Sequence, residues 1–240
     1  MDTETSQTVT VSFFRYCGFQ KFWGMMQMAA SRSPMRKMNG LQFFKPVGTG
    51  SGIGYSIRPD FSVYGMLAVW ESERDADNFL SSGYFRRFIA HSSEQYTVFL
   101  KPLGSKGSWS GFNQWRFSSP SAESHLIAAL TRATVRIRFL VKFWSMVPRV
   151  SREHEGFRGL IFTKGIGEYP LFEQATFTIW ENKECMNEFA WNTFHATAIR
   201  ETRKRKGFKE EMFTRLQPFR SAGTWKGTDP LKGHFLETPG

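Results

Sequence analysis

The chain has 240 residues, of which 40% are hydrophobic and 16% aromatic, and it carries a net charge of +11. No apolar run approaches the ~18 residues of a membrane-spanning helix, and residues 1–8 are polar, unlike a secretory signal. We therefore expect no transmembrane helix and a cytoplasmic location. The positive charge favours an anionic partner such as lipid or an acidic protein. Nucleic acid is not expected, because no zinc-finger spacing or RNA-binding aromatic signature accompanies the charge.

The first half of the chain predicts six elements of alternating type. Segments rich in β-formers predict strands, and aromatic and Met residues at helical spacing predict helices. In chain order we expect strand 8–14, helix 19–38, strands 41–45 and 63–70, helix 75–95 and strand 96–103.

The second half predicts the same elements in the same order. They are strand 131–137, a helix to about Arg152, strands 160–163 and 175–180, a helix from Lys183 to about Arg205, and strand 212–219. The order β-α-β-β-α-β is that of the ferredoxin-like unit.

Short motifs confirm that the halves are related. In unchanged order, Lys21-Phe22-Trp23 recurs as Lys142-Phe143-Trp144, Gly40-Leu41 as Gly159-Leu160, and Trp70-Glu71 as Trp180-Glu181. Trp109 likewise recurs as Trp225, so six of the eight tryptophans form pairs and chance resemblance is very improbable. We predict an N-terminal ferredoxin-like repeat at 1–112, a linker at 113–127 and a C-terminal repeat at 128–240.

The duplication predicts the architecture. Helices cover one face of a four-stranded antiparallel sheet, and its other apolar face must also be covered. Two fused units solve this by packing sheet on sheet. We therefore predict an α+β fold, a pseudo-twofold dimeric α/β barrel built by tandem duplication, with pockets between sheet and helices.

His195 is the candidate functional residue, because only the second copy carries a histidine at its position. Aligning Trp180 with Trp70 places His195 opposite Phe85, in the middle of the predicted helix. Trp191 and Ile199, four residues before and after, would share its apolar face. A lone histidine on such a face is more often a core residue, and this reading remains open. It lacks the further ligands of a bare metal site, but haem requires only one protein ligand. Arg200 and Arg203 could then meet the propionates.

Other reactive motifs are weak. Cys17 and Cys185 lie in apolar segments and predict reduced, buried thiols. The glycine-rich run 48–54 lacks the context of a phosphate-binding loop and predicts a flexible connection or entrance flap. The histidines other than His195, including His154, are expected at the surface. No nucleophile elbow or Cys–His pair supports hydrolase chemistry.

A run of motifs in the second half resembles the spheroidene monooxygenase family of carotenoid ketolases and hydroxylases. The run comprises Leu130-Thr131-Arg132-Ala133-Thr134-Val135-Arg136, Lys142-Phe143-Trp144, Gly165-x-Gly167-Glu168-x-Pro170, Thr176-Phe177-x-x-Trp180-Glu181, Phe189-Ala190, His195-x-x-Ala198-Ile199-Arg200-x-x-Arg203, Glu210-Glu211-x-Phe213-x-Arg215 and Gly223-Thr224-Trp225-x-Gly227-x-Asp229-Pro230-Leu231. The resemblance implies a haem b monooxygenase that uses O₂ and a reductant such as ferredoxin. Its substrate would be a long apolar carotenoid, and His195 the proximal iron ligand.

Two alternatives remain open from the sequence. One keeps the fold and the haem but changes the reaction to that of a peroxidase or a dehydratase, since fold does not determine function. The other is a non-enzymatic module that binds an apolar ligand, with His195 as a core residue. An apolar substrate would have to come from a membrane, and the basic surface could hold the protein on anionic lipid or dock an acidic ferredoxin.

Overall fold

The computed structural model describes residues 6–52, 56–121, 124–169 and 171–235. Pro170, within one motif of the sequence resemblance, lies outside these ranges, as do residues 53–54 of the glycine-rich run. The first copy comprises β1 (Thr8–Arg15), α1 (Gln20–Ala30), α2 (Arg32–Met35), β2 (Leu41–Gly50), β3 (Pro59–Trp70), α3 (Glu73–Leu80), α4 (Gly83–His91) and β4 (Glu94–Gly107). The second comprises β5 (Ile127–Val135), a 3₁₀ turn (Ile137–Phe139), α5 (Leu140–His154), β6 (Leu160–Gly167), β7 (Glu173–Trp180), α6 (Lys183–Asn192), α7 (Phe194–Lys204) and β8 (Phe208–Gly223).

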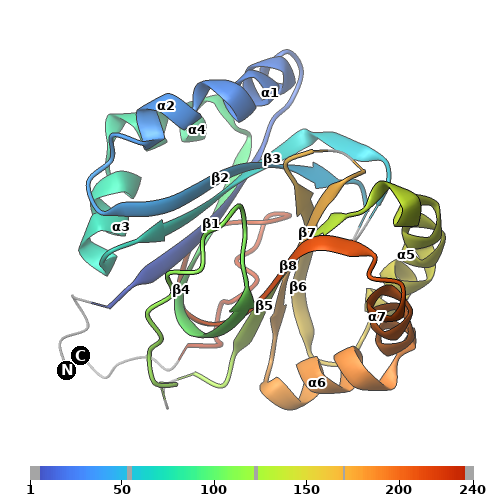
Figure 1. Cartoon of the computed structure of the whole chain (residues 1–240). Coiled ribbons are helices and arrows are strands. Elements are labelled where there is room, and N and C mark those ends of the chain that lie inside the picture. The colour runs from blue at the N-terminus through green and yellow to red at the C-terminus, as the bar shows by residue number, and fades with distance from the viewer. Residues whose placement is uncertain (1–5, 53–55, 122–123, 170, 236–240) are drawn as a thin grey trace.

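The strands form one closed antiparallel barrel in the order β1-β3-β2-β6-β7-β5-β8-β4. Each copy supplies one four-stranded sheet, and the helices cover the outer faces of the two sheets (Figure 1). The seam between β4 and β8 is long, running from the Tyr96–Gly223 pair to the Gly107–Met212 pair. The seam between β2 and β6 has only two pairs, Gly48–Gly167 and Thr49–Ile166. The predicted dimeric α/β barrel is confirmed.

The barrel interior is packed with apolar side chains from both sheets. Phe13, Phe162 and Phe177 are buried there, with ring centroids 5.5–6.2 Å apart. Trp109 and Trp225, from matching turns after β4 and β8, join the same cluster. Because side chains fill the interior, ligand sites are expected outside the barrel, between each sheet and its helices.

The turns that carry these tryptophans require glycine at matching positions. Gly107 has φ +88° and Gly223 has φ +86°, a conformation that side chains rarely adopt. A Cβ at Gly107 would also lie 2.0 Å from the carbonyl oxygen of Glu211. The repeated Ser-x-Gly-x-Trp-x-Gly pattern is therefore a structural requirement of both copies.

Three predictions were wrong; they concern the glycine-rich run, the burial of Cys17 and the helix over 75–95. Gly48 and Gly50 belong to β2, because the strand continues past Lys45 to pair with β6. Cys17 is exposed, whereas Cys185 is buried as expected. The helix predicted over 75–95 is two helices, since the side chain of Ser82 caps a new one at Gly83. The repeat boundaries at 112 and 128 stay a prediction; β4 ends at Gly107 and β5 begins at Ile127.

Candidate functional site

His195 takes the place in the second copy that Phe85 takes in the first. The Phe85 ring lies 5.3 Å from the ring of Phe79. The His195 ring lies 5.3 Å from the ring of Phe189, the residue that corresponds to Phe79 in the aligned sequence. The two copies therefore place a phenyl ring and an imidazole at equivalent points between helix and sheet.

His195 is the second residue of α7 rather than a mid-helix residue. The helix expected from Lys183 to Arg205 breaks at Thr193, whose backbone is extended and whose hydroxyl accepts a hydrogen bond from the His195 N–H (3.2 Å). Hydroxyl capping of this kind starts a new helix. Trp191 consequently belongs to α6 and is 59% exposed. The expectation that it shares a helical face with His195 was wrong.

The imidazole of His195 has one occupied and one free nitrogen. Its Nδ1 lies 3.5 Å from the carbonyl oxygen of Ala190. Among the described residues, no hydrogen-bond partner reaches its Nε2. Burial lowers the pKa of His195, although the Ala190 carbonyl and the charge of Glu153 act against burial. The ring is therefore neutral at pH 7, with a lone pair available at Nε2 when Nδ1 carries the proton.

His154, expected at the surface, is buried in the same cluster. It is the last residue of α5, is 4% exposed, and its ring centroid lies 4.2 Å from that of Phe189. Phe189 thus has a histidine on either side. In the first copy the equivalent residue is Met35. It ends α2, precedes β2 by the same number of residues as His154 precedes β6, and is fully buried. The two positions that hold Met35 and Phe85 in the first copy hold histidines in the second.

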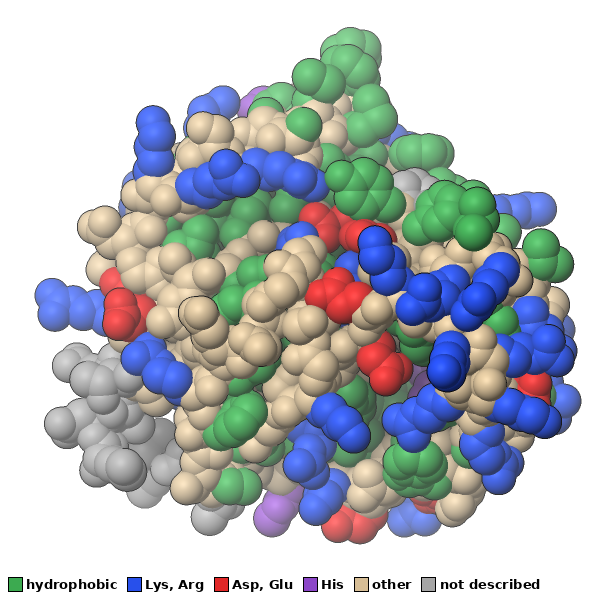
Figure 2. All heavy atoms as spheres, viewed as in Figure 1, with side chains coloured by type: hydrophobic (Ala, Val, Ile, Leu, Met, Phe, Trp, Pro, Cys, Tyr) green, Lys and Arg blue, Asp and Glu red, His purple; other side chains and the backbone are tan. Residues whose placement is uncertain are grey.

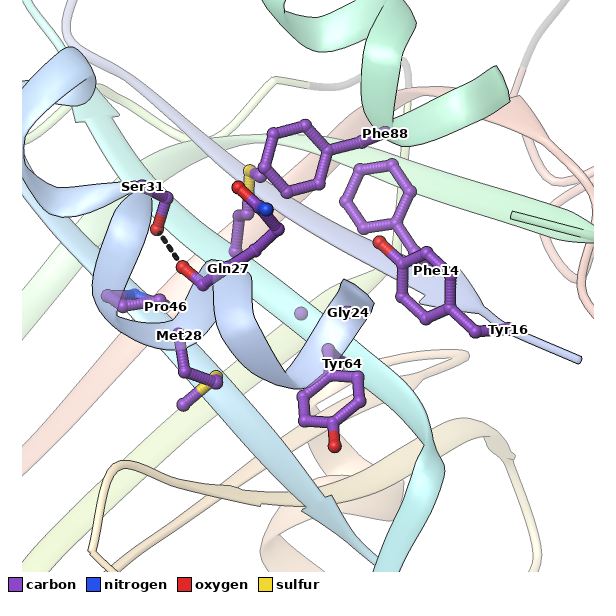
Figure 3. Close-up of a pocket in the computed structure, with 11 residues that line it drawn as sticks. Phe14, Tyr16, Gly24, Gln27, Met28, Ser31, Pro46, Tyr64 and Phe88 are labelled. Atoms are coloured by element: carbon purple, nitrogen blue, oxygen red, sulfur yellow. Dashed lines mark hydrogen bonds between the residues drawn. The ribbon is translucent and has the colours of Figure 1, made fainter. Parts of the chain in front are cut away.

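Aromatic rings fill the layer between helices and sheet in the first copy. Phe85 lies 5.6 Å from Phe14, which lies 5.4 Å from Phe88. Figure 3 shows the rings of Phe14, Phe88 and Tyr16 near Gly24 of α1. A Cβ at Gly24 would lie 2.8 Å from the ring of Tyr16, so only glycine permits the approach. The cavity that remains measures about 10 Å³, room for one water molecule.

Small residues replace these rings in the second copy. Thr8 of β1 and Ile127 of β5 pair with Trp70 and Trp180, respectively, and this fixes the correspondence between the sheets. Counting from these pairs, the second-copy residues opposite Phe14, Tyr16, Met66 and Phe88 are Ala133, Val135, Thr176 and Ala198. His195 therefore stands at the position of Phe85, while several of the large side chains near Phe85 have smaller counterparts in the second copy.

Part of the outer sheet face is more exposed in the second copy than in the first. Ser12 and Met66 are buried in the first copy, whereas their counterparts Thr131 and Thr176 are exposed and half-exposed. Helix α1 packs on β2 and β3, whereas α5 packs chiefly on α7, and α7 packs on α6 and α5. The single apolar cluster of the first copy is correspondingly divided in two. We call the region around these more exposed strand residues the second-copy cleft; it is defined by Thr131, Ala133, Thr176, His195 and Ala198.

The remaining predicted site residues lie along α7. Ile199 is half-buried, whereas Arg200 and Arg203 are exposed, with Arg200 donating to Thr197 Oγ1 (3.3 Å). Arg203 has no ion-pair partner among the described residues. The structure thus brings His195 and Ile199 onto one helix with the two arginines at its solvent side, and it separates Trp191 from them.

A second cavity lies at the edge of β2, lined mainly by residues of the first copy. It measures about 310 Å³ and is lined by Arg32, Arg36, Lys45, Glu168 and the apolar side chains of β2. The Glu168 carboxylate, 3% exposed, accepts from Lys45 Nζ (2.7 Å) and from Trp109 Nε1 (3.2 Å). These contacts join the two copies and are assigned a structural role.

Sequence comparison finds similarity to three spheroidene monooxygenases. It is 36% identical over 229 residues to the spheroidene monooxygenase of Cereibacter sphaeroides, covering 94% of this chain and 71% of the relative. The chain belongs to the spheroidene monooxygenase family. The Rhodobacter capsulatus member is 36% identical, with 95% of this chain and 97% of the relative covered. The Rubrivivax gelatinosus member is 32% identical, with 86% and 80% covered.

Comparison with solved structures supports the fold alone. An aldoxime dehydratase crystallised with butyraldoxime superposes with a TM-score of 0.59 at 9% identity, covering 91% of this chain and 81% of that one. No family model matches the sequence.

Proposed function

We propose that the chain is a haem-dependent monooxygenase that inserts oxygen into a long apolar polyene such as an acyclic carotenoid. The family relatives bear the name of such a reaction. The observation that carries the haem assignment is the replacement of the packed Phe85–Phe14 pair by His195 and Ala133 at the corresponding positions. A neutral imidazole in a layer that has smaller side chains at these positions suits an iron porphyrin, which needs one protein donor and space.

Residues of α6 and α7 would hold the haem. His195 would donate Nε2 to the iron, while the Ala190 carbonyl orients the ring through Nδ1. Arg200 and Arg203, exposed on α7, would pair with the propionates. Bound haem would supply the activation of O₂. Thr131, Ala133 and Thr176 would leave space for a substrate along the sheet.

The external partners follow from the chemistry. A monooxygenase requires O₂ and electrons, and the basic surface suits an acidic reductant such as ferredoxin. In Figure 2, lysine and arginine side chains gather at the right of the view, over α5 and α7. These helices flank His195, so a docked reductant would lie close to the cofactor.

The absorption spectrum of the purified protein tests the haem assignment. We expect a Soret band in the wild type and its loss in His195→Phe, which restores the residue of the first copy. His125→Gln, at an exposed position, is the control and should keep the band. Loss of the band in His154→Met, with retention in His195→Phe, would place the ligand at His154 and refute the assignment.

Product analysis separates the remaining reactions. Oxygenated carotenoid formed from carotenoid, O₂ and a reductant would support the monooxygenase. Turnover of peroxide with a dye, without carotenoid product, would indicate a peroxidase, and a dehydrated product would indicate a dehydratase. Failure to take up haem at all would favour a ligand-binding module in which His195 is a core residue.

A further inference from the structure

Five exposed apolar side chains form one patch at the start of α5. Ile137 and Val141 are 78% and 86% exposed, at the 3₁₀ turn and in the first turn of α5. Tyr169, Leu171 and Phe172, in the β6–β7 turn, are also exposed. We call these five residues the α5 patch. Apolar side chains this exposed, grouped together, indicate an interaction surface.

Hydrogen bonds hold the two parts of the α5 patch together. The N–H of Val135 donates to the Phe172 carbonyl (2.8 Å), and the indole N–H of Trp144 donates to the Leu171 carbonyl (3.2 Å). Leu171 has φ +72°, a left-handed conformation that is strained for a leucine. The turn therefore keeps an exposed leucine in a costly conformation, which points to a role outside the folding of this chain.

Basic residues alternate with the apolar ones. Arg136, Arg138 and Lys142 are exposed and flank Ile137 and Val141 along the chain. The run at the end of α7, 203–206, adjoins them, because the N–H of Arg136 donates to the Gly207 carbonyl (2.8 Å). In Figure 2, apolar side chains project at the upper right, above the basic side chains of α5 and α7.

The acidic groups nearest the α5 patch are engaged. Glu168 is buried and paired with Lys45, and Glu173 is paired with Arg132. The surface therefore combines projecting apolar side chains with surrounding positive charge, of which Arg205 is paired with Glu201. That combination matches the interface of an anionic bilayer, where apolar side chains enter the acyl region and basic ones meet lipid phosphates.

We propose that the α5 patch docks the protein on anionic lipid, with Ile137 and Val141 inserted below the headgroups. Docking does not depend on haem or on His195. It does place the membrane beside the second-copy cleft, since Thr131 lies four residues along β5 from Val135, about 13 Å. An apolar molecule dissolved in the bilayer would therefore have a short path to His195.

Vesicle co-sedimentation of the full chain tests this proposal. The vesicles are phosphatidylcholine alone, or phosphatidylcholine with a third of phosphatidylglycerol. We expect wild-type binding to the mixed vesicles and a fall of about a hundredfold or more in the partition coefficient for Ile137→Ser/Val141→Ser. Arg138→Gln/Lys142→Gln should lower binding to the mixed vesicles by about fivefold per charge. Both pairs are exposed, so circular dichroism should show an unchanged fold.

Phe117→Ser is the matched control, because Phe117 is also an exposed apolar side chain but does not belong to the α5 patch. Its binding should equal that of the wild type. The proposal is overturned if the wild type ignores mixed vesicles, or if Ile137→Ser/Val141→Ser binds as the wild type does. It is equally overturned if only Phe19→Ser/Phe22→Ser, at the start of α1, abolishes binding, since the docking surface would then lie on the first copy.

Discussion

At the scale of single residues, two histidines distinguish the copies. His154 and His195 lie on either side of Phe189 and stand where the first copy has Met35 and Phe85. The position of His195 could be read from the sequence because Trp70 and Trp180 fix the local alignment. His154 was missed because the Lys-Phe-Trp motif, used to align the preceding helix, has a different offset from the Gly-Leu motif that follows. Counting back from the Gly-Leu motif would have paired His154 with Met35.

Burial of His154 predicts a pH dependence of stability. Burial lowers its pKa to about 4, assisted by the nearby His195 and opposed by the Val150 carbonyl. In the unfolded chain the pKa is about 6.5. Between these values the unfolded state binds more protons, so stability is fully present above pH 6.5 and is lost as the pH falls toward 4. The loss is at most about 3 kcal/mol.

Denaturant unfolding of the apoprotein at pH 7 and pH 4.5 measures this effect. His154→Met, with the side chain of the first copy, should lose less stability between the two pH values than the wild type does. His125→Gln, at an exposed position, should behave as the wild type. Equal losses in all three proteins would mean that His154 does not contribute.

At the scale of elements, the difference between the copies lies in how the helices approach the sheet. The Lys-Phe-Trp motif recurs in α1 and α5, yet Gly24 is buried in α1 while its counterpart Ser145 is exposed in α5. The motif therefore predicted that both helices exist but not which face each presents. The break of the last helix was also hidden, because Thr193 is compatible with a helix and acts as a cap only through its hydrogen bond to His195.

Ala198→Phe tests the second-copy cleft, because it restores the ring of Phe88 at the matching position. Ala198 packs against Val135, Phe139 and Met146, so the added ring should cost about 1–3 kcal/mol of unfolding free energy by overpacking. Haem uptake, measured by titration of the apoprotein, should fall sharply because the ring occupies the layer beside His195.

Phe88→Ala is the reciprocal variant. It empties a packed site in the first copy and should cost about 3–5 kcal/mol of unfolding free energy. Haem uptake by its folded fraction should stay at the wild-type level, since the first copy does not form the cleft. Loss of uptake in Phe88→Ala, or its retention in Ala198→Phe, would show that the cleft is not where haem binds.

At the scale of the whole molecule, duplication allows one copy to hold the fold while the other changes. Paired tryptophans and the element order sufficed to predict the barrel, because both are repeated. They could not predict how the barrel closes. The β4–β8 seam is long, but β2 and β6 share only the pairs at Gly48 and Thr49. Side chains distant in the sequence must stabilise this second seam.

Among the described residues, no helix has the length and apolar character needed to cross a bilayer.

Glu168 should be the main support of the short seam. Its buried carboxylate pairs with Lys45 and Arg32 of the first copy and accepts from Trp109, so it joins both copies at three points. Glu168→Gln keeps the shape of the side chain but leaves the Lys45 ammonium, itself largely buried, without its counter-charge. Removing one member of a buried pair costs about 3–5 kcal/mol, and we expect the lower end because Arg32 is half-exposed.

Denaturant unfolding of Glu168→Gln against Glu201→Gln measures this contribution. Glu201 pairs with Arg205 on the surface of α7, and its loss should cost less than about 1 kcal/mol. Because the β2–β6 seam has so few backbone pairs, Glu168→Gln should also speed amide exchange at Thr49 and Ile166 more than in the β4–β8 seam. Uniform exchange along both seams would mean that backbone pairing alone closes the barrel.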